Sequence, residues 1–151
     1  MIKNIAGTIG VAILTALLFI FVLSPMLEPM VGQVAGGKIT PAEWMAAFTN
    51  WCLIACGVCL VSVIVWVLLS AHTYPIDPSG THTQMPYWIL HALPPLAAAL
   101  AGYFIQPAIA DGWLEALLVI LIPILLQYWI SSVFFSPNPR SVMLATLVRR
   151  K

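Results

Sequence analysis

The sequence predicts an all-α integral membrane protein in which four helices cross the bilayer as two hairpins. Two observations lead to this fold class. Of the 151 residues, 62% are hydrophobic and 7% are charged, whereas a soluble domain carries about 25% charged residues. The apolar residues also form four stretches of about 20 residues, the length with which a helix crosses a hydrocarbon core about 30 Å thick. We therefore treat residues 1–151 as a single four-span membrane domain.

The first predicted span covers residues 5–24 and contains no charged residue. Lys3 precedes it, and Pro25 is expected to end it because proline removes a backbone donor. A cleaved signal peptide is the alternative for an apolar segment near the N-terminus. We favour a span, because the stretch is long for a signal peptide and residues 24–29 lack a small-x-small cleavage site.

A loop rich in proline and glycine follows, and a short interfacial helix is expected inside it before the second span. Thr40 can cap this helix, Pro41 suits its first position, and Glu43 stands where a capping box needs it. The short helix can lie on the membrane surface, or it can continue directly into the second span at residues 51–70. In that span, unbroken apolar length outweighs the strand preference of the β-branched side chains.

The third and fourth spans are predicted at residues 87–105 and 113–135. Pro94 and Pro95 lie inside the third span, and because both lack a backbone donor we expect a kink or a broken turn there. Residues 140–151 form a basic tail that is too short to span and can lie as a second interfacial helix against anionic lipid.

Lysine and arginine set the predicted orientation, because the cytoplasmic loops of membrane proteins are enriched in both. Four of the six basic residues lie in the C-terminal tail, and Lys3 lies near the other end. An even number of spans places both termini on one side. We therefore expect both termini in the cytoplasm and the chain in a bacterial inner (plasma) membrane. The loop at residues 71–86 is then cytoplasmic, although it contains no lysine or arginine.

Three cysteines, Cys52, Cys56 and Cys59, follow the spacing C-x3-C-x2-C within the second span. This spacing occurs in soluble enzymes that hold an iron–sulfur cluster, where a flexible loop lets three thiolates converge. On a helix, positions i, i+4 and i+7 form a stripe about 10 Å long, which cannot wrap one cluster. We therefore interpret the cysteines as small polarizable residues at a contact between helices.

Small residues four positions apart let helix backbones approach closely and mark further candidate contacts. Gln127, deep in the fourth span, can also hydrogen-bond between helices. The number of such faces predicts packing against other membrane subunits as well as within the chain. The pairs are Ala6 and Gly10, Ala12 and Ala16, Cys52 and Cys56, and Ala98 and Gly102.

His72 and His91 form a candidate cofactor site. His72 follows the second span and His91 lies about one turn into the third, so an antiparallel hairpin would bring the two to a similar depth. Two imidazoles at one depth can ligate haem b, or they can hold copper. In the alternative interpretation, His72 is an interfacial polar residue and His91 hydrogen-bonds a carbonyl that the two prolines leave free.

The function classes follow from what the sequence lacks and what it repeats. It contains no Ser-His-Asp order, phosphate-binding glycine loop, H-E-x-x-H or dinucleotide fingerprint. A net charge of +1 gives no basic field for nucleic acid. The leading hypothesis is a non-enzymatic small subunit or accessory (scaffold) protein of a larger membrane complex, with no cofactor. The alternatives are a haem- or copper-binding redox anchor that uses His72 and His91, and a pore-forming (holin-like) or small transport protein.

Overall fold

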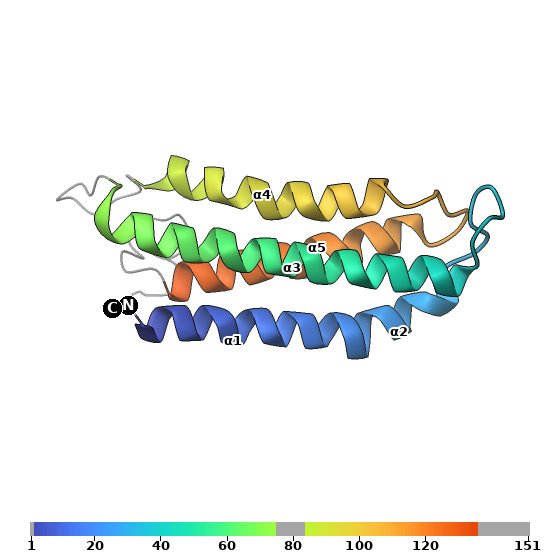
Figure 1. The fold of residues 1–151 in the computed structure, drawn as a ribbon, viewed down its shortest axis with the longest axis horizontal. Coiled ribbons are helices and arrows are strands. Elements are labelled where there is room, and N and C mark those ends of the chain that lie inside the picture. The colour runs from blue at the N-terminus through green and yellow to red at the C-terminus, as the bar shows by residue number, and fades with distance from the viewer. Residues whose placement is uncertain (1, 75–83, 136–151) are drawn as a thin grey trace.

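The computed structural model describes residues 2–74 and 84–135, and the regular elements in this part of the chain are all helical. Figure 1 shows the long helices side by side along a common axis. Four helices are long and apolar enough to cross a membrane, which confirms the predicted all-α class. In chain order the elements are α1 (Ile2–Leu18), η1 (Phe19–Leu23), α2 (Ser24–Leu27), η2 (Glu28–Met30), α3 (Pro41–His72), α4 (Met85–Phe104) and α5 (Trp113–Phe134).

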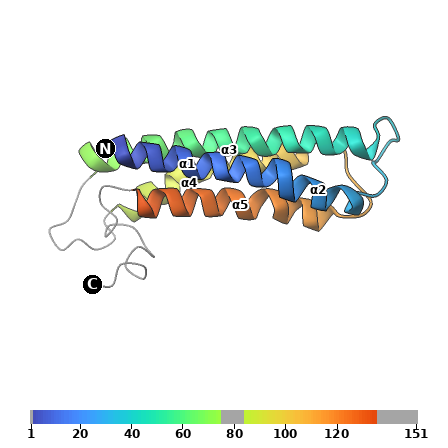
Figure 2. The ribbon, with the colours of Figure 1, turned by 90° about the horizontal axis from the view of Figure 1, so that it is seen from below.

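Helix α3 contacts each of the other three long helices of the bundle, α1, α4 and α5. Helix α5 also contacts α1 and α4. Figures 1 and 2 show α1 and α4 on opposite sides of the pair formed by α3 and α5. The core therefore lies around the inner faces of α3 and α5, and the grouping of the spans into two hairpins stays a prediction.

The sequence predicts that the first span ends at Pro25, and this boundary is wrong. The helical segment continues to Met30. The turn before the proline is a π-helix, η1, in which the Ser24 N–H bonds the carbonyl of Phe19, five residues earlier. This wider turn gives room before the proline ring, whose position in an ordinary α-helix would clash with the preceding turn. Ser24 then hydrogen-bonds Thr49 of α3 through their hydroxyl groups at 2.7 Å, which fixes the continued segment to the bundle.

The capping box predicted at the start of α3 is confirmed. The Thr40 hydroxyl accepts from the Glu43 backbone N–H at 3.2 Å, and the Glu43 carboxylate accepts from the Thr40 N–H at 2.7 Å. Of the two alternatives for this helix, the structure confirms the one in which it continues directly into the second predicted span. The separate interfacial helix is wrong, because α3 runs without a break from Pro41 to His72. Its 32 residues correspond to about 48 Å, longer than a hydrocarbon core of about 30 Å.

Helices α4 and α5 lie close to the predicted third and fourth spans. Helix α4 continues through Pro94 and Pro95, so the expected broken turn does not occur. Helix α5 likewise contains Pro123 and ends at Phe134. The basic tail at 140–151 and most of the loop at 71–86 lie outside the described residues.

Two connections lie at one end of the bundle: residues 31–40 join η2 to α3, and residues 105–112 join α4 to α5. They pair with each other through backbone hydrogen bonds. The Ala35 N–H donates to Ala108 at 2.7 Å, and the Ala110 N–H donates to Gln33 at 2.9 Å. Trp44, near the start of α3, adds a bond from its indole Nε1 to the Pro107 carbonyl at 2.9 Å. Both connections are therefore tied to each other and to α3, and they form the end of the bundle that we call the loop end.

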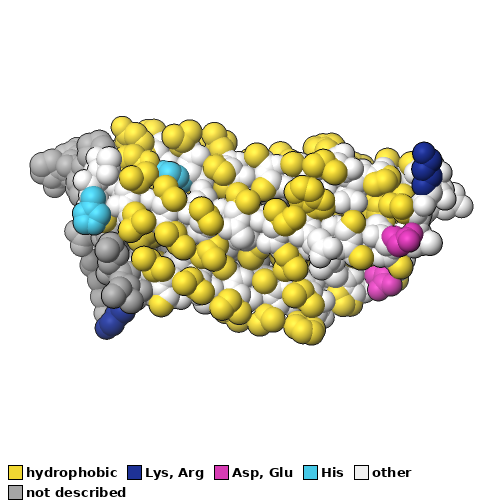
Figure 3. Space-filling model, viewed as in Figure 1, with side chains coloured by type: hydrophobic (Ala, Val, Ile, Leu, Met, Phe, Trp, Pro, Cys, Tyr) yellow, Lys and Arg dark blue, Asp and Glu magenta, His cyan; other side chains and the backbone are white. Residues whose placement is uncertain are grey.

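Apolar side chains cover the outside of the bundle as well as its core. Trp66 and Phe48 are fully buried, whereas Phe21 is 70% exposed and Phe104 is 73% exposed. Figure 3 shows hydrophobic side chains over the middle of the visible face and charged side chains near its two ends. In water, such a continuous apolar surface would be unusual for a monomer.

Candidate functional site

His91, one of the two histidines singled out from the sequence, lies in a hydrogen-bonded cluster between α3 and α4. Its ring Nε2 is 2.7 Å from the hydroxyl of Tyr74, which follows the end of α3. The His91 ring also lies against buried Trp66, with 6.0 Å between the ring centroids. Tyr74 in turn stacks on Tyr87 of α4 at 4.3 Å. This aromatic cluster holds the imidazole in one orientation.

The backbone at His91 is held by Ser62 of α3. In an α-helix the His91 carbonyl would accept from residue 95, but Pro95 has no N–H. The Ser62 hydroxyl donates to this free carbonyl. The sequence interpretation placed His91 itself as the donor to a carbonyl freed by the prolines; instead its ring bonds Tyr74 and its own carbonyl is the freed group.

A shallow groove opens beside this cluster on the outer surface of the bundle. It has a volume of about 470 Å³ and lies between α3 and α4. Val61 is 62% exposed along it, so the groove faces the surroundings of the bundle and not its core. The side chains that line it are those of Val58, Val61, Ser62, Val65, His91 and Pro94, with Gly57 at one end.

His72 stands apart from this cluster as an exposed residue at the end of α3. The ring contacts that the structure gives His91 are with Tyr74 and Trp66. Axial ligation of His91 through Nε2 would require the hydrogen bond to Tyr74 to break. Among the described residues, no group of three or more His, Cys, Asp or Glu side chains is placed to hold a metal ion. The haem or copper site of His72 and His91 therefore stays a prediction.

The three cysteines lie inside the bundle with their thiols free of disulfides. The Cys56 thiol donates to the Ala12 carbonyl of α1 at 3.3 Å, and the Cys59 thiol contacts the Ile124 carbonyl of α5 at 3.8 Å. Cys52 is fully buried. The stripe therefore joins α3 to α1 and α5 within this chain.

Gln127 and Gly102 also lie on inner faces. The Gln127 Nε2 donates to the Cys56 carbonyl at 3.1 Å, while its buried Oε1 has no partner among the described residues. Gly102 is buried against Trp51 of α3, where an added Cβ would lie 2.9 Å from the tryptophan Cβ. Ala98 is partly buried and packs against the core. These candidates serve contacts between α3, α4 and α5.

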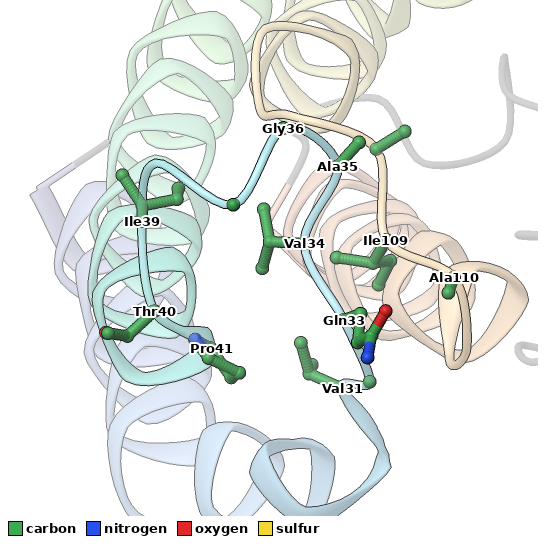
Figure 4. Close-up of a pocket in the computed structure, with 13 residues that line it drawn as sticks. Val31, Gln33, Val34, Ala35, Gly36, Ile39, Thr40, Pro41, Ile109 and Ala110 are labelled. Carbon is green, nitrogen blue, oxygen red and sulfur yellow. The ribbon is translucent and has the colours of Figure 1, made fainter.

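A second open pocket, of about 960 Å³, lies at the loop end. Figure 4 shows Val31 and Val34 projecting into the space between the arms of the loop that joins η2 to α3. Small apolar side chains and backbone line it, together with Gln33 and Thr40. None of the described residues that line this pocket has a titratable side chain, so none of them could act as a general acid or base.

Charged residues of the described segments separate along the bundle axis. Lys3 lies in the first turn of α1. The described carboxylates lie at the loop end, where η2, α3 and α5 begin, and in the connection before α5. One described lysine, Lys38, lies there with them. The loop end is therefore acidic. Its carboxylates belong to Glu28, Glu43, Asp111 and Glu115.

Sequence reasoning missed Ser62, Trp66 and Tyr74 as partners of His91, and it also missed Tyr87 as the ring that stacks on Tyr74. One signal for Ser62 was available, since an internal Pro95 leaves a carbonyl that needs a donor from a neighbouring helix. No protein-family model matches this chain, and comparison with curated proteins and with solved structures also gives no match. The class is therefore defined by the fold: an all-helical chain with four helices long and apolar enough to cross a membrane.

Proposed function

We propose that the chain is an integral membrane protein whose four apolar helical segments each cross the bilayer. The segments are Lys3–Met30, Pro41–His72, Met85–Ile105 and Trp113–Phe134. Two features support insertion: the exposed apolar side chains around the bundle and the position of the charged residues near its ends. In a bilayer, lipid would cover this apolar surface, whose exposure to water would be unfavourable.

We further propose that both termini face the cytoplasm of a bacterial cell, with the chain in the inner membrane. The basic residues near both termini support this orientation, since the described residues of the loop end contain a single lysine, Lys38, and no arginine. Because the three native thiols are buried, introduced cysteines can report it. In intact spheroplasts, a membrane-impermeant maleimide should label a Lys38→Cys variant but not a Lys3→Cys variant. Labelling of the Lys3→Cys variant alone would show that the orientation is the opposite of the one proposed.

Within that membrane, we propose that the chain is a non-enzymatic subunit or accessory protein that packs against other membrane proteins. One observation carries this proposal: Ala6 and Gly10 form a small-residue pair on α1 that is exposed. A Cβ added at Gly10 would meet nothing within 4 Å. Such a face allows close approach of a helix from a second protein.

The other predicted pairs give the contrast that makes this observation useful. Ala12, Cys52, Cys56 and Gly102 are buried inside the bundle, so the chain's own folding accounts for them. No such account applies to Ala6 and Gly10. The pair Ala97 and Ala101 on α4 is exposed in the same way and offers a second face.

The test compares the size of the assembly for wild type and two glycine variants extracted from native membranes in a mild detergent. We expect wild type to migrate in a large complex on a native gel, and Gly10→Leu to shift it to the size of the free chain. Gly57→Leu is the matched control, because Gly57 is also exposed and an added Cβ there meets nothing within 4 Å. Extraction of wild type as a stable monomer would overturn the proposal.

The redox anchor and the pore or transporter remain predictions from the sequence, and no observation favours either over the subunit. For a pore along the bundle axis of one chain, the inward side chains of Cys56, Cys59, Ile124 and Gln127 would have to move, since they are buried against one another's helices.

A further inference from the structure

We propose that the groove between α3 and α4 binds the head ring of an isoprenoid quinone. The groove combines an open apolar wall, built from Val58, Val61 and Val65, with two polar residues, Ser62 and His91. Ligand sites of this kind are mostly apolar and have a few fixed polar groups. A volume of about 470 Å³ lies within the usual range of about 300–1,000 Å³ for small-molecule sites.

The charge of the lining selects a neutral ligand. Among the described residues, no lysine, arginine, aspartate or glutamate lines the groove. A phosphate headgroup or a fatty-acid carboxylate placed there would be poorly solvated and would have no cation to pair with. A ligand with an uncharged head and an apolar tail fits, and isoprenoid quinones have that form.

The hydrogen bond between Tyr74 and His91 fits both redox states of such a ligand. When the Tyr74 hydroxyl donates to Nε2, the imidazole Nδ1 carries the proton and can donate to a quinone carbonyl. When Nε2 carries the proton instead, Nδ1 can accept from a quinol hydroxyl. Nδ1 has no hydrogen-bond partner among the described residues, so it is available for this bond. A phospholipid ester offers an acceptor alone.

The depth of the groove also suits a molecule anchored at the membrane edge. His91 lies six residues from the start of α4, about 9 Å along the helix axis. Gly57 and Pro94 lie at the other end of the groove, deeper in the bundle. The polar ring can therefore sit near the interface by His91 while the isoprenoid tail extends past Gly57 into lipid.

This inference rests on the proposed membrane insertion but not on the proposed partner. The two fail separately: release of the chain from membranes by a sodium carbonate wash would overturn insertion, whereas quinone binding is measured on the purified chain. Purified full-length protein is placed in phosphatidylcholine nanodiscs and photolabelled with an azido-benzoquinone that carries a geranyl tail.

We expect saturable labelling of α3 or α4 next to the groove, and loss of this labelling in the presence of excess unlabelled quinone. His91→Phe should weaken binding about five- to tenfold by removing one hydrogen bond, and His91→Gln, which keeps a donor and an acceptor, should restore part of it. Gly57→Leu fills the groove and should abolish labelling. His72→Ala, at an exposed position outside the groove, should bind as wild type does.

Protection of the three buried thiols from maleimide shows that each variant is folded. Equal labelling of wild type and Gly57→Leu would overturn the proposal, as would label spread evenly over the four helices. Methyl oleate, a neutral ester with a single tail, is the second competitor. Competition by methyl oleate as strong as that by quinone would assign the groove to ordinary acyl chains and would also overturn the proposal.

Discussion

The hydroxyl of Ser62 on α3 donates to the carbonyl of His91 on α4. Two features of the chain meet in this bond. Pro95 removes the N–H that the His91 carbonyl would otherwise accept from, and α3 approaches α4 closely enough for a short side chain to replace it. A proline inside a span is tolerated where a neighbouring helix satisfies the freed group. This bond therefore accounts for the carbonyl that Pro95 leaves free within α4.

The first prediction tests that relationship by a double-mutant cycle. Ser62→Ala should destabilise the wild-type bundle by about 1 kcal/mol, because the His91 carbonyl then has no donor. In a Pro95→Ala background, where residue 95 supplies an N–H, the same change should have almost no effect. Stability is measured in detergent micelles from the rate at which the three buried thiols react with maleimide. Equal effects of Ser62→Ala in both backgrounds would show that the hydroxyl does not serve this carbonyl.

The second prediction concerns the contact between Gly102 and Trp51. An alanine Cβ at position 102 would lie 3.3 Å from the Trp51 Cγ and 2.9 Å from the Trp51 Cβ, an atom that moves only if the helix backbone moves. Gly102→Ala should therefore destabilise the protein by about 1–3 kcal/mol. Gly10→Ala is the control, because that position is open and alanine favours helix. A neutral Gly102→Ala variant would mean that α3 and α4 are farther apart than described.

The third prediction compares two glycines with positive φ. Gly112 has a φ of 77° at the start of α5, and Gly36 has a φ of 85° in the loop end. Alanine at either position meets the same backbone strain, about 1–2 kcal/mol. At Gly112, however, an added Cβ would also lie 2.6 Å from the Met30 carbonyl oxygen, whereas nothing lies within 4 Å at Gly36. Gly112→Ala should therefore lower stability more than Gly36→Ala, and equal effects would contradict the packing of η2 against α5.

Local features of the fold could be predicted from the sequence, and long-range ones could not. The capping box of Thr40 and Glu43 depends on residues three positions apart, and the structure confirms it. The spans followed from apolar length. Pro25 misled the prediction of the first boundary, because a π-turn ahead of a proline lets the helix continue. The sequence has no simple signal for such a turn.

The candidate site shows the same division. The Pro94–Pro95 pair predicted that a carbonyl near His91 would need a donor, which is a local consequence of the missing N–H groups. The donor, Ser62, lies 29 residues away, and its role depends on which face of α3 meets α4. The partner of the His91 ring, Tyr74, depends on how the chain leaves α3. Periodicity alone predicts neither orientation.

The last prediction concerns Gln127, whose side-chain amide is buried and, within the described part of the chain, has a hydrogen-bond partner for its nitrogen but not for its oxygen. Nε2 donates to the Cys56 carbonyl at 3.1 Å, but Oε1 has no partner among the described residues. A buried acceptor without a donor costs about 1–3 kcal/mol, which is comparable to or larger than the gain from one hydrogen bond. Gln127→Met, of similar shape, should therefore leave stability unchanged or raise it by about 1 kcal/mol, whereas Gln127→Ala should lower it by about 2 kcal/mol through a cavity. Maleimide protection of the thiols measures both. Destabilisation by Gln127→Met as large as that by Gln127→Ala would contradict the prediction, because the hydrogen bonding of the Gln127 amide would then outweigh the cost of its unpaired Oε1.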